Sequence, residues 1–246
     1  MAANRYEDIA DDLRNNIANG LFRAGDQLPA ETELARRYEA SVPTVRIALG
    51  VLQDAGLIEK QQGRGNFVRQ PFERITYSND RFAADRRAAF STALNVSVRS
   101  SGVKASDTLS ALLQVPRGAL LIEYVYLSHQ GTSPHSLARI YVPWSVANLS
   151  THRTSRSPLG DDIRGQLAES GVQTASTVER VTARLPDPME AKTLRLGTGA
   201  PVLAIERISM DATGRVVEAA LLVLPGHRTE AVFTTHAPIQ ELEAAG

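Results

Sequence analysis

The chain has 246 residues, of which 43% are hydrophobic and 22% are charged, and its 27 basic residues balance its 27 acidic ones. This length and composition predict two globular domains, and the balanced charge decides nothing about nucleic acid. The absence of cysteine excludes a disulfide scaffold, a thiolate metal site and a cysteine nucleophile. The charged amino terminus is unlike a signal peptide and no segment approaches roughly 18 apolar residues, so we expect a cytoplasmic protein without a membrane span.

Apolar residues recur at helical spacing near the amino terminus, and Gly20 can end this first helix in a left-handed cap. Its apolar face comprises Tyr6, Ile9, Leu13 and Ile17. A second helix is expected from Glu31 to Tyr38, because acidic residues fill its first turn, where they suit the helix dipole. Ser41 can cap a third helix that has Pro43 in its first turn and ends at Gly56.

Two short apolar runs follow, Leu57-Ile58 and Phe67-Val68. The polar stretch between them is rich in glycine, which predicts a β-hairpin. Three helices followed by a β-ribbon are typical of a winged helix-turn-helix. We therefore expect a DNA-binding domain over residues 1–70.

Apolar residues become sparse over residues 71–93, which we interpret as a linker into the second domain. Seven basic residues stand against three acidic ones from Lys60 to Arg87. The basic residues are Lys60, Arg64, Arg69, Arg74, Arg81, Arg86 and Arg87. This excess suits a segment that runs beside a phosphate backbone, and a solvated linker would look the same.

Residues 94–236 predict an α+β domain built on antiparallel hairpins, followed by a tail over residues 237–246. Strands are expected over Leu120–His129, Ser136–Val142, Thr177–Arg184, Val202–Asp211 and Val216–Leu224. Helices are expected over Asp161–Ser170 and Pro188–Leu196. A fixed shift superposes Leu113, Gly118 and Ser128 on Leu194, Gly199 and Ser209, so two hairpins should be structural counterparts, by duplication or by chance.

The first domain carries many residues at fixed spacing, by which it resembles the GntR family of bacterial transcription factors. These residues are Tyr6, Ile9, Ala10, Leu13, Gly25, Leu28, Pro29, Glu31, Glu33, Leu34, Ala35, Val42, Thr44, Val45, Arg46, Ala48, Leu49, Leu52, Gly56, Leu57, Ile58, Gly63, Arg64, Gly65, Phe67 and Val68. The second domain resembles the UTRA ligand-sensing domain of the HutC-type subgroup. The residues that carry this resemblance are Arg139, Tyr141, Pro143, Glu179, Val181, Ala183, Ala191, Leu194, Gly199, Ala200, Pro201, Val202, Leu203, Val217, Glu218, Gly226 and Arg228.

These resemblances imply a homodimer that binds double-stranded operator DNA and a second domain with a chorismate-lyase-like fold. They imply effectors such as phosphosugars, amino acids or other small metabolites. Family members commonly carry arginine where this chain has Thr32 and Val42, so its operator need not be the commonest half-site. Phosphosugar-binding relatives carry arginines where this chain has Tyr124 and Tyr126 and a glutamate at Ala138, which disfavours an aminosugar phosphate.

The expected DNA contacts lie on the second and third helices and at the hairpin tip. They are Thr32, Arg36, Arg37, Ser41, Pro43, Thr44, Arg46, Gly63 and Arg64. A recognition helix contacts bases and phosphates from its amino-terminal turns, where Arg46 offers forked donors. Arg64 lies between two glycines that let the backbone approach a phosphate. A solvated helix arginine and an ordinary flexible hairpin tip are the alternatives.

The expected effector site lies where the two hairpins meet, because Arg139 and Glu218 sit on their returning strands and could meet Glu179 across the seam. The full candidate set is Tyr124, Tyr126, Arg139, Glu179, Glu218 and Arg228. The two tyrosines share one face of a strand and offer rings and hydroxyl groups to a ligand. A structural salt bridge and plain core packing are the alternative interpretations.

We expect a transcriptional regulator, most often a repressor, whose operator affinity responds to a small molecule. An enzyme of chorismate-lyase-like fold is the main alternative, and a ligand-independent architectural or plasmid-partition DNA binder is another. Catalytic sequence motifs and metal spacing of the five histidines are lacking. We therefore assign no catalytic residue, metal site or cofactor.

Overall fold

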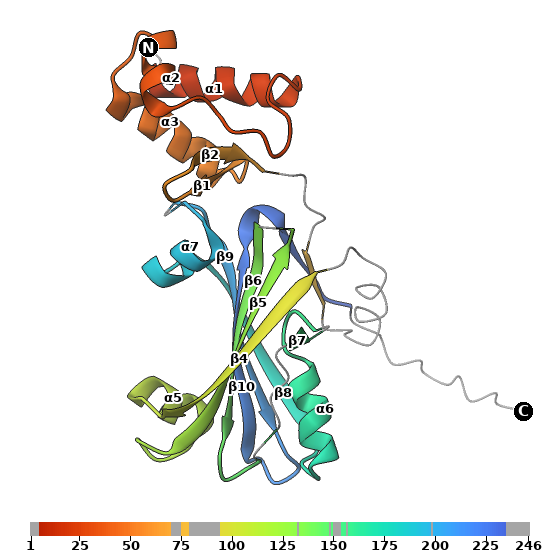
Figure 1. Cartoon of the computed structure of the whole chain (residues 1–246). Helices are drawn as coiled ribbons and strands as arrows, with labels where there is room; N and C mark the ends of the chain where they lie inside the picture. The colour runs from red at the N-terminus through yellow and green to blue at the C-terminus, as the bar shows by residue number, and fades with distance from the viewer. Residues whose placement is uncertain are drawn as a thin grey trace, which may run out of the picture.

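The computed structural model describes residues 5–69, 75–78, 94–131, 133–147, 149, 154–155, 157–197 and 199–234. Three helices and a short hairpin form one unit, which is stacked on the end of a long antiparallel sheet (Figure 1). This mixture of helices and antiparallel strands confirms the predicted α+β class. Within the described residues, no helix is long and apolar enough to cross a membrane.

The amino-terminal unit is the predicted winged helix-turn-helix. Its elements are α1 (Arg5–Ala18), α2 (Glu31–Arg37), α3 (Val42–Asp54), β1 (Ile58–Gln61) and β2 (Gly65–Val68). Their apolar residues meet in one core that includes Leu13, Leu34, Leu52 and Ile58. Ser41 caps α3 as expected, because its hydroxyl accepts a hydrogen bond from the backbone N–H of Thr44 at 3.3 Å.

The second unit is built on a seven-stranded antiparallel sheet with strand order β7-β4-β5-β6-β10-β9-β8. Its strands are β4 (Asn95–Lys104), β5 (Leu120–Gln130), β6 (Ser133–Pro143), β7 (Thr154–Ser155), β8 (Ser176–Arg184), β9 (Val202–Met210) and β10 (Val216–Pro225). The five expected strands are present. The sequence did not predict β4, because Val96 and Val98 are its only buried residues and its second half is polar.

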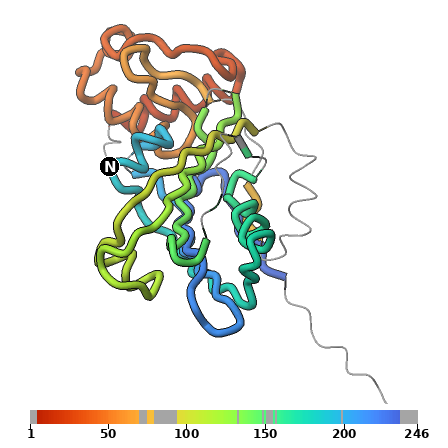
Figure 2. Tube along the Cα trace, turned by 60° about the horizontal axis from the view of Figure 1, so that its bottom comes forward, coloured from red at the N-terminus to blue at the C-terminus, as the bar shows by residue number. Residues whose placement is uncertain are grey.

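Helices cover both faces of this sheet. On one face lies α6 (Asp162–Glu169), and on the other lie α5 (Asp107–Leu113) and α7 (Pro188–Leu194), as Figures 1 and 2 show. We call these the α6 face and the α5/α7 face. Side chains alternate along each strand, so neighbouring residues belong to different faces.

The hairpins β5–β6 and β9–β10 are structural counterparts, as the fixed shift along the sequence predicted. Each follows a short helix that ends in a left-handed residue, Gln114 with φ 54° or Arg195 with φ 51°. Strands β6 and β10 pair with each other and form the seam between the two halves of the sheet. The region is therefore made of two similar halves of one continuous sheet.

The expectation of a linker over residues 71–93 is wrong at Ile75–Ser78. These residues form β3, which pairs in parallel with β11 (Thr229–Val232) just after the short helix η1 (Gly226–Arg228). Tyr77 is buried in the core of the second unit. Four residues are too short a run to show strand periodicity in a sequence. The rest of the expected linker, with Arg74, Arg81, Arg86 and Arg87, and the expected tail lie outside the described residues.

Candidate DNA interface and effector site

The residues expected to contact DNA all lie at the surface of the winged-helix domain. Thr44 is partly exposed. The other eight residues are exposed, namely Thr32, Arg36, Arg37, Ser41, Pro43, Arg46, Gly63 and Arg64. Capping by Ser41 fixes the first turn of α3, which holds Pro43 and Thr44 at the end of the helix. These side chains therefore have the exposure that contact with DNA requires.

The carboxylate of Glu31 on α2 is shared by a basic side chain of α3 and a basic side chain of the wing. The Nε and Nη2 atoms of Arg46 lie 3.1 and 2.8 Å from Oε2 of Glu31, and Nζ of Lys60 lies 3.8 Å from Oε1 of the same carboxylate. The hydrogen bond and negative charge of Glu31 raise the pKa of Arg46. Glu31 and Lys60 were not among the expected site residues. They place the recognition helix and β1 of the wing on one surface.

The wing tip is held in shape by Gln27. Its Nε2 donates to the backbone oxygen of Arg64 at 2.6 Å, and a Cβ at Gly65, where φ is +111°, would lie 2.9 Å from that nitrogen. The guanidinium of Arg64 stacks 5.4 Å from the ring centre of Phe67. Glycine at position 65 therefore permits a compact tip that presents Arg64 at its end.

The candidate effector residues do not form one cluster. Tyr124, Tyr126, Glu179 and Glu218 belong to the α6 face, whereas Arg139 pairs with Leu221, which packs in the core of the α5/α7 face. The expectation that Arg139, Glu179 and Glu218 meet across the seam is therefore wrong. The sequence placed them on neighbouring strands, but the pairing register decides which face each side chain occupies.

A buried polar network lies on the α6 face. The fully buried guanidinium of Arg207 donates from Nη2 to Oε1 of Glu218 at 2.7 Å and from Nη1 to Oδ1 of Asp161 at 2.8 Å. The hydroxyl of Ser209 donates to Glu218 at 3.3 Å, and Arg164 pairs with Asp161. Burial lowers the pKa of Arg207, but the two carboxylates outweigh burial, so the net shift is upward.

Sequence reasoning missed Arg207 and Asp161. The available signal was period-two alternation, because Ile205, Arg207 and Ser209 share one face of an apolar strand. An arginine at such an inward position requires a buried partner. Glu218, which pairs with Ser209 in the sheet register, is that partner and was expected at the site.

Both candidate tyrosines are 1% exposed. The hydroxyl of Tyr124 donates to the backbone oxygen of Leu149 at 3.3 Å, and Tyr126 hydrogen-bonds to Asp162. Burial, followed by the charge of Asp162, raises the pKa of Tyr126. The Oδ2 atom of Asp162 accepts a hydrogen bond from Ser155 at 2.9 Å. The Oδ1 atom of Asp162 and the Oε1 atom of Gln166, one helical turn later, are buried without a hydrogen-bond partner. The network thus retains acceptors that a ligand could satisfy.

Arg228 lies elsewhere, in η1 at the end of the sheet that faces the wing. It is 4% exposed, and its Nη2 donates to the backbone oxygens of Pro134 and, at 3.2 Å, His135. Burial, followed by the positive charge of Arg69, lowers its pKa to about 9. These contacts tie η1 to the start of β6 and fit a structural role better than ligand binding.

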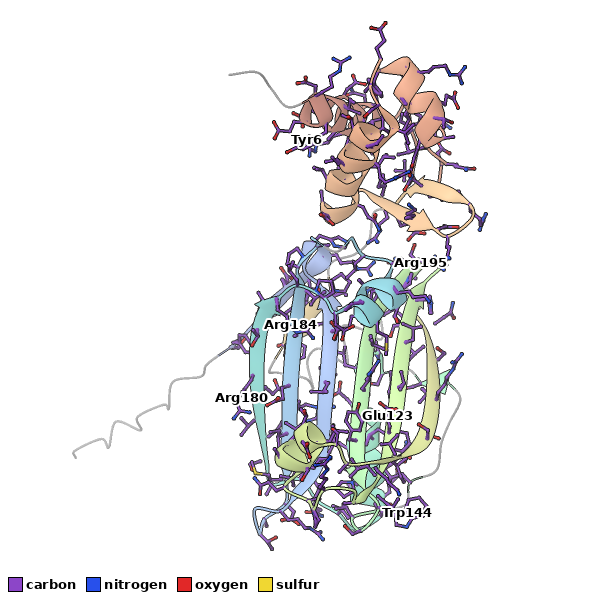
Figure 3. All side chains as sticks on the ribbon, turned by 90° about the vertical axis from the view of Figure 1, so that its left-hand side faces the viewer. Tyr6, Glu123, Trp144, Arg180, Arg184 and Arg195 are labelled. Carbon is purple, nitrogen blue, oxygen red and sulfur yellow. The ribbon has the colours of Figure 1, made fainter. Side chains whose placement is uncertain are left out.

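Arg139 lines a groove of about 470 Å³ on the α5/α7 face. Along the edge strand β8, Arg180 and Arg184 border the groove, and both are labelled in Figure 3. The Nη1 and Nη2 atoms of Arg184 donate to the two carboxylate oxygens of Glu190 on α7, each at 2.7 Å. The Nη2 atom of Arg139 lies 2.8 Å from the sulfur of Met189. The groove therefore combines charged rims with an apolar floor.

A winged helix-turn-helix with surface arginines, joined to a sheet domain with a buried polar network, defines a DNA-binding regulator with a ligand-sensing domain. The chain belongs to the GntR family of bacterial regulatory proteins, whose model matches residues 5–68. The model of the UTRA domain matches residues 95–230. It is therefore a transcriptional regulator with a GntR DNA-binding domain and a UTRA ligand-binding domain.

Known proteins similar to this chain are regulators rather than enzymes. An HTH-type transcriptional regulator of Rhizobium meliloti is 30% identical over 226 residues, which are 89% of this chain and 89% of that protein. The HTH-type transcriptional repressor NagR of Bacillus subtilis is 25% identical over 91% of both chains. The crystal structure of PhnF from Mycobacterium smegmatis superposes with a TM-score of 0.58 at 23% identity, over 96% of this chain and 100% of that one, and supports the fold.

Proposed function

We propose that this protein is a cytoplasmic repressor that binds its operator as a homodimer and releases it when a small molecule occupies the second domain. The shared ion pair of Arg46, Glu31 and Lys60 carries the proposal, because its cationic groups come from the recognition helix and from the wing and lie together on one exposed surface. We assign residues 1–70 to DNA binding and residues 94–236, together with Ile75–Ser78, to effector binding and dimerisation. No residue is assigned a catalytic role.

On this surface, α3 would enter the major groove and the wing would follow the neighbouring backbone. Arg46 and Thr44 lie in the first turns of α3, where base edges and phosphates come within reach. Arg64 and Gly63 at the wing tip suit a phosphate contact, which positions the protein without reading sequence. Thr32, Arg36 and Arg37 on α2 are assigned to the flanking backbone.

The effector site that we propose lies on the α6 face, beside Tyr124, Tyr126, Glu179 and Glu218. Its support is the buried network around Arg207, together with the unpaired acceptors of Asp162 and Gln166. Unpaired buried acceptors favour a ligand that offers several N–H or O–H donors. Arg139 is reassigned from the effector site to the groove on the opposite face.

The homodimer that we propose uses the α5/α7 face. The two helices lie at opposite ends of this face, and between them the groove carries Arg139, Arg180 and Glu206. Val178 is 44% exposed and Met189 is 59% exposed beside it. Charges of both signs next to apolar side chains suit an isologous contact, in which the same patch on each copy faces the other.

Fluorescence anisotropy with an operator duplex selected from random DNA tests the proposal. Wild-type protein, Arg46→Ala and the control Arg215→Ala, which changes an exposed arginine in the turn between β9 and β10, would be titrated side by side. The proposal predicts that only Arg46→Ala loses specific binding. Wild-type affinity in a correctly folded Arg46→Ala protein would refute the assigned interface. Metabolites would then be screened for release of the same duplex.

A further inference from the structure

The carboxylate of Asp54 reaches from the winged-helix domain into the second domain. Asp54 is the last residue of the recognition helix α3, and it accepts hydrogen bonds from the backbone N–H groups of Gly199 and Ala200. These residues belong to the turn that connects α7 to β9. A side chain at the end of the DNA-reading helix is thus bound directly by the effector domain.

Two glycines make room for this carboxylate. A Cβ at Gly197 would lie 1.8 Å from Oδ1 of Asp54, and a Cβ at Gly199 would lie 2.3 Å from its Oδ2. What these positions exclude is any side chain that would displace the Asp54 carboxylate.

Asp54 does not serve the stability of its own helix. A carboxylate in the last turn faces the negative end of the helix dipole, which is locally unfavourable. Burial at the junction raises the pKa of Asp54, which the two backbone hydrogen bonds oppose. The hydrogen bonds from Gly199 and Ala200 of the second domain stabilise the charged carboxylate and so offset its unfavourable position at the end of α3.

A second set of buried contacts surrounds Glu59 of the wing. Its two carboxylate oxygens accept hydrogen bonds from Gln61 and from Ser133 at the start of β6, each at 2.9 Å. Nη1 of Arg195, at the end of α7, lies 3.5 Å away, and Figure 3 shows Arg195 at the end of the sheet nearest the wing. Glu59 is 3% exposed, so this contact between domains is sealed from water.

Arg69 closes the junction. Its Nη2 donates to the backbone oxygen of Arg195 at 2.8 Å, and its Nη1 lies 3.0 Å from Nε2 of His227. The His227 ring packs so closely on Gly56 that a Cβ there would lie 2.2 Å from it. The wing and the end of α3 are therefore both held against the second domain.

We propose that Asp54 and the turn containing Gly197, Gly199 and Ala200 form an interdomain joint that sets the orientation of the recognition helix relative to the effector domain. Asp54 acts as a positioning residue, since it orients α3 through the joint. The turn is rooted in the second core, where Leu196 is 5% exposed and Ala200 is 0% exposed.

The joint also lies at the start of β9, the strand that carries Arg207 of the α6-face network. A shift of β9 upon ligand binding would move the joint and α3 with it. This consequence rests on the proposed effector site, whereas the joint itself does not. Strand β9 connects the two sites, and rigid elements of secondary structure can carry coupling between distant sites.

The joint can be tested on the free full-length protein, without operator or effector. The chain has no cysteine, so Asn15→Cys on α1 and Ala168→Cys on α6, both exposed positions, can carry two spin labels. Electron–electron resonance then gives the distance distribution between the domains, with excess unlabelled protein added to separate the pairs in a dimer. We expect a single narrow distribution.

Variants at Asp54 and Gly199 form a double-mutant cycle. Asp54→Ala and Gly199→Ala should each broaden the distribution, and the double variant should broaden it no further, because both remove the same interaction. Gly102→Ala is the control, since nothing lies within 4 Å of that position and its φ is not positive. Asp54→Asn keeps one acceptor oxygen, so its distance distribution should be narrower than that of Asp54→Ala and broader than that of the wild type. Circular dichroism would show that each variant is folded.

A wild-type width in Asp54→Ala would overturn the joint, as would a wild-type distribution already as broad as those of the variants. Additive broadening in the double variant would show that Asp54 and Gly199 act separately, which also contradicts the proposal. Because the measurement needs no ligand, its failure leaves the proposed effector response intact. Failure to find an effector would likewise leave the joint untouched.

Discussion

Arg46 on the recognition helix lies against Glu31 on the preceding helix, with its Nη2 atom 2.8 Å from the carboxylate. The side chain of Arg46 remains 61% exposed. An exposed ion pair of this kind stabilises a protein by little, typically about 0–1 kcal/mol, so a phosphate or a guanine can replace Glu31 as its partner. The pair therefore holds Arg46 ready at the surface without locking it.

Arg46→Ala should abolish sequence-specific binding, at a cost of about 1–3 kcal/mol for each base that the arginine side chain recognises in the operator. Glu31→Gln should strengthen binding to unrelated duplexes, because it removes a negative charge that both Arg46 and Lys60 approach. Anisotropy titrations with the selected and a scrambled duplex measure both effects. Weaker binding of the scrambled duplex by Glu31→Gln would contradict this account of the pair.

Arg64→Ala should behave differently from Arg46→Ala. A phosphate contact carries no sequence information, so affinity should fall by a similar factor for every duplex, and the salt slope should decrease by about one. Titrations over a series of salt concentrations provide both quantities. A selective loss for the operator would instead assign a base contact to Arg64.

The sequence predicted the winged-helix domain almost completely, because helix periodicity, the Ser41 cap and the Gly63-Arg64-Gly65 turn are local signals. It predicted the strands of the second domain but not the faces of its side chains. Arg139 and Glu218 looked like partners on adjacent strands, yet register put them on opposite faces. Asp161 could not be predicted, because its contact with Arg207 comes from the turn before α6 and no local pattern encodes such a contact.

Breaking the buried network should cost far more stability than removing a surface arginine. Arg207→Met leaves Glu218 buried without its main partner, and such losses typically cost about 3–5 kcal/mol. Arg180→Met removes a largely exposed ion pair with Glu206 on the next strand and should cost less than about 1 kcal/mol. Urea unfolding followed by circular dichroism compares the two. Equal midpoints would show that the network is not needed for the fold.

Two histidines, one buried and one half-buried, should make stability fall in mild acid. Burial lowers the pKa of His135 and of His227 to about 4, and nearby arginines contribute. The unfolded chain, with histidine pKa near 6.5, therefore binds protons first as the pH falls. The stabilisation is complete above about pH 6.5 and is lost progressively as the pH drops toward 4.

For His135, which is 7% exposed, this loss reaches at most about 2 kcal/mol between pH 6.5 and pH 5. Urea midpoints at pH 7 and pH 5 would be compared for wild-type protein and His135→Leu. The variant should lose less stability over this interval, because carboxylates contribute equally to both proteins. An equal loss would mean that His135 keeps an ordinary pKa in the folded state.

A Val178→Arg variant tests the dimer surface. Val178 is exposed on β8, and an arginine there would add a positive charge beside Arg180 on each copy. Sedimentation at micromolar concentration should show a dimer for the wild type and a monomer for the variant. Ala168→Arg, which adds the same charge at an exposed position of α6 on the opposite face, serves as the control. A dimer that survives in Val178→Arg would place the interface elsewhere.

The central claim is that effector and operator share one conformational equilibrium. Linkage requires each ligand to change the affinity of the other by the same factor, typically about 5–150-fold. Calorimetric titration of a confirmed effector into free protein and into operator-bound protein measures that factor directly. The account predicts weaker effector binding to the operator complex, and equal affinities in the two titrations would contradict it.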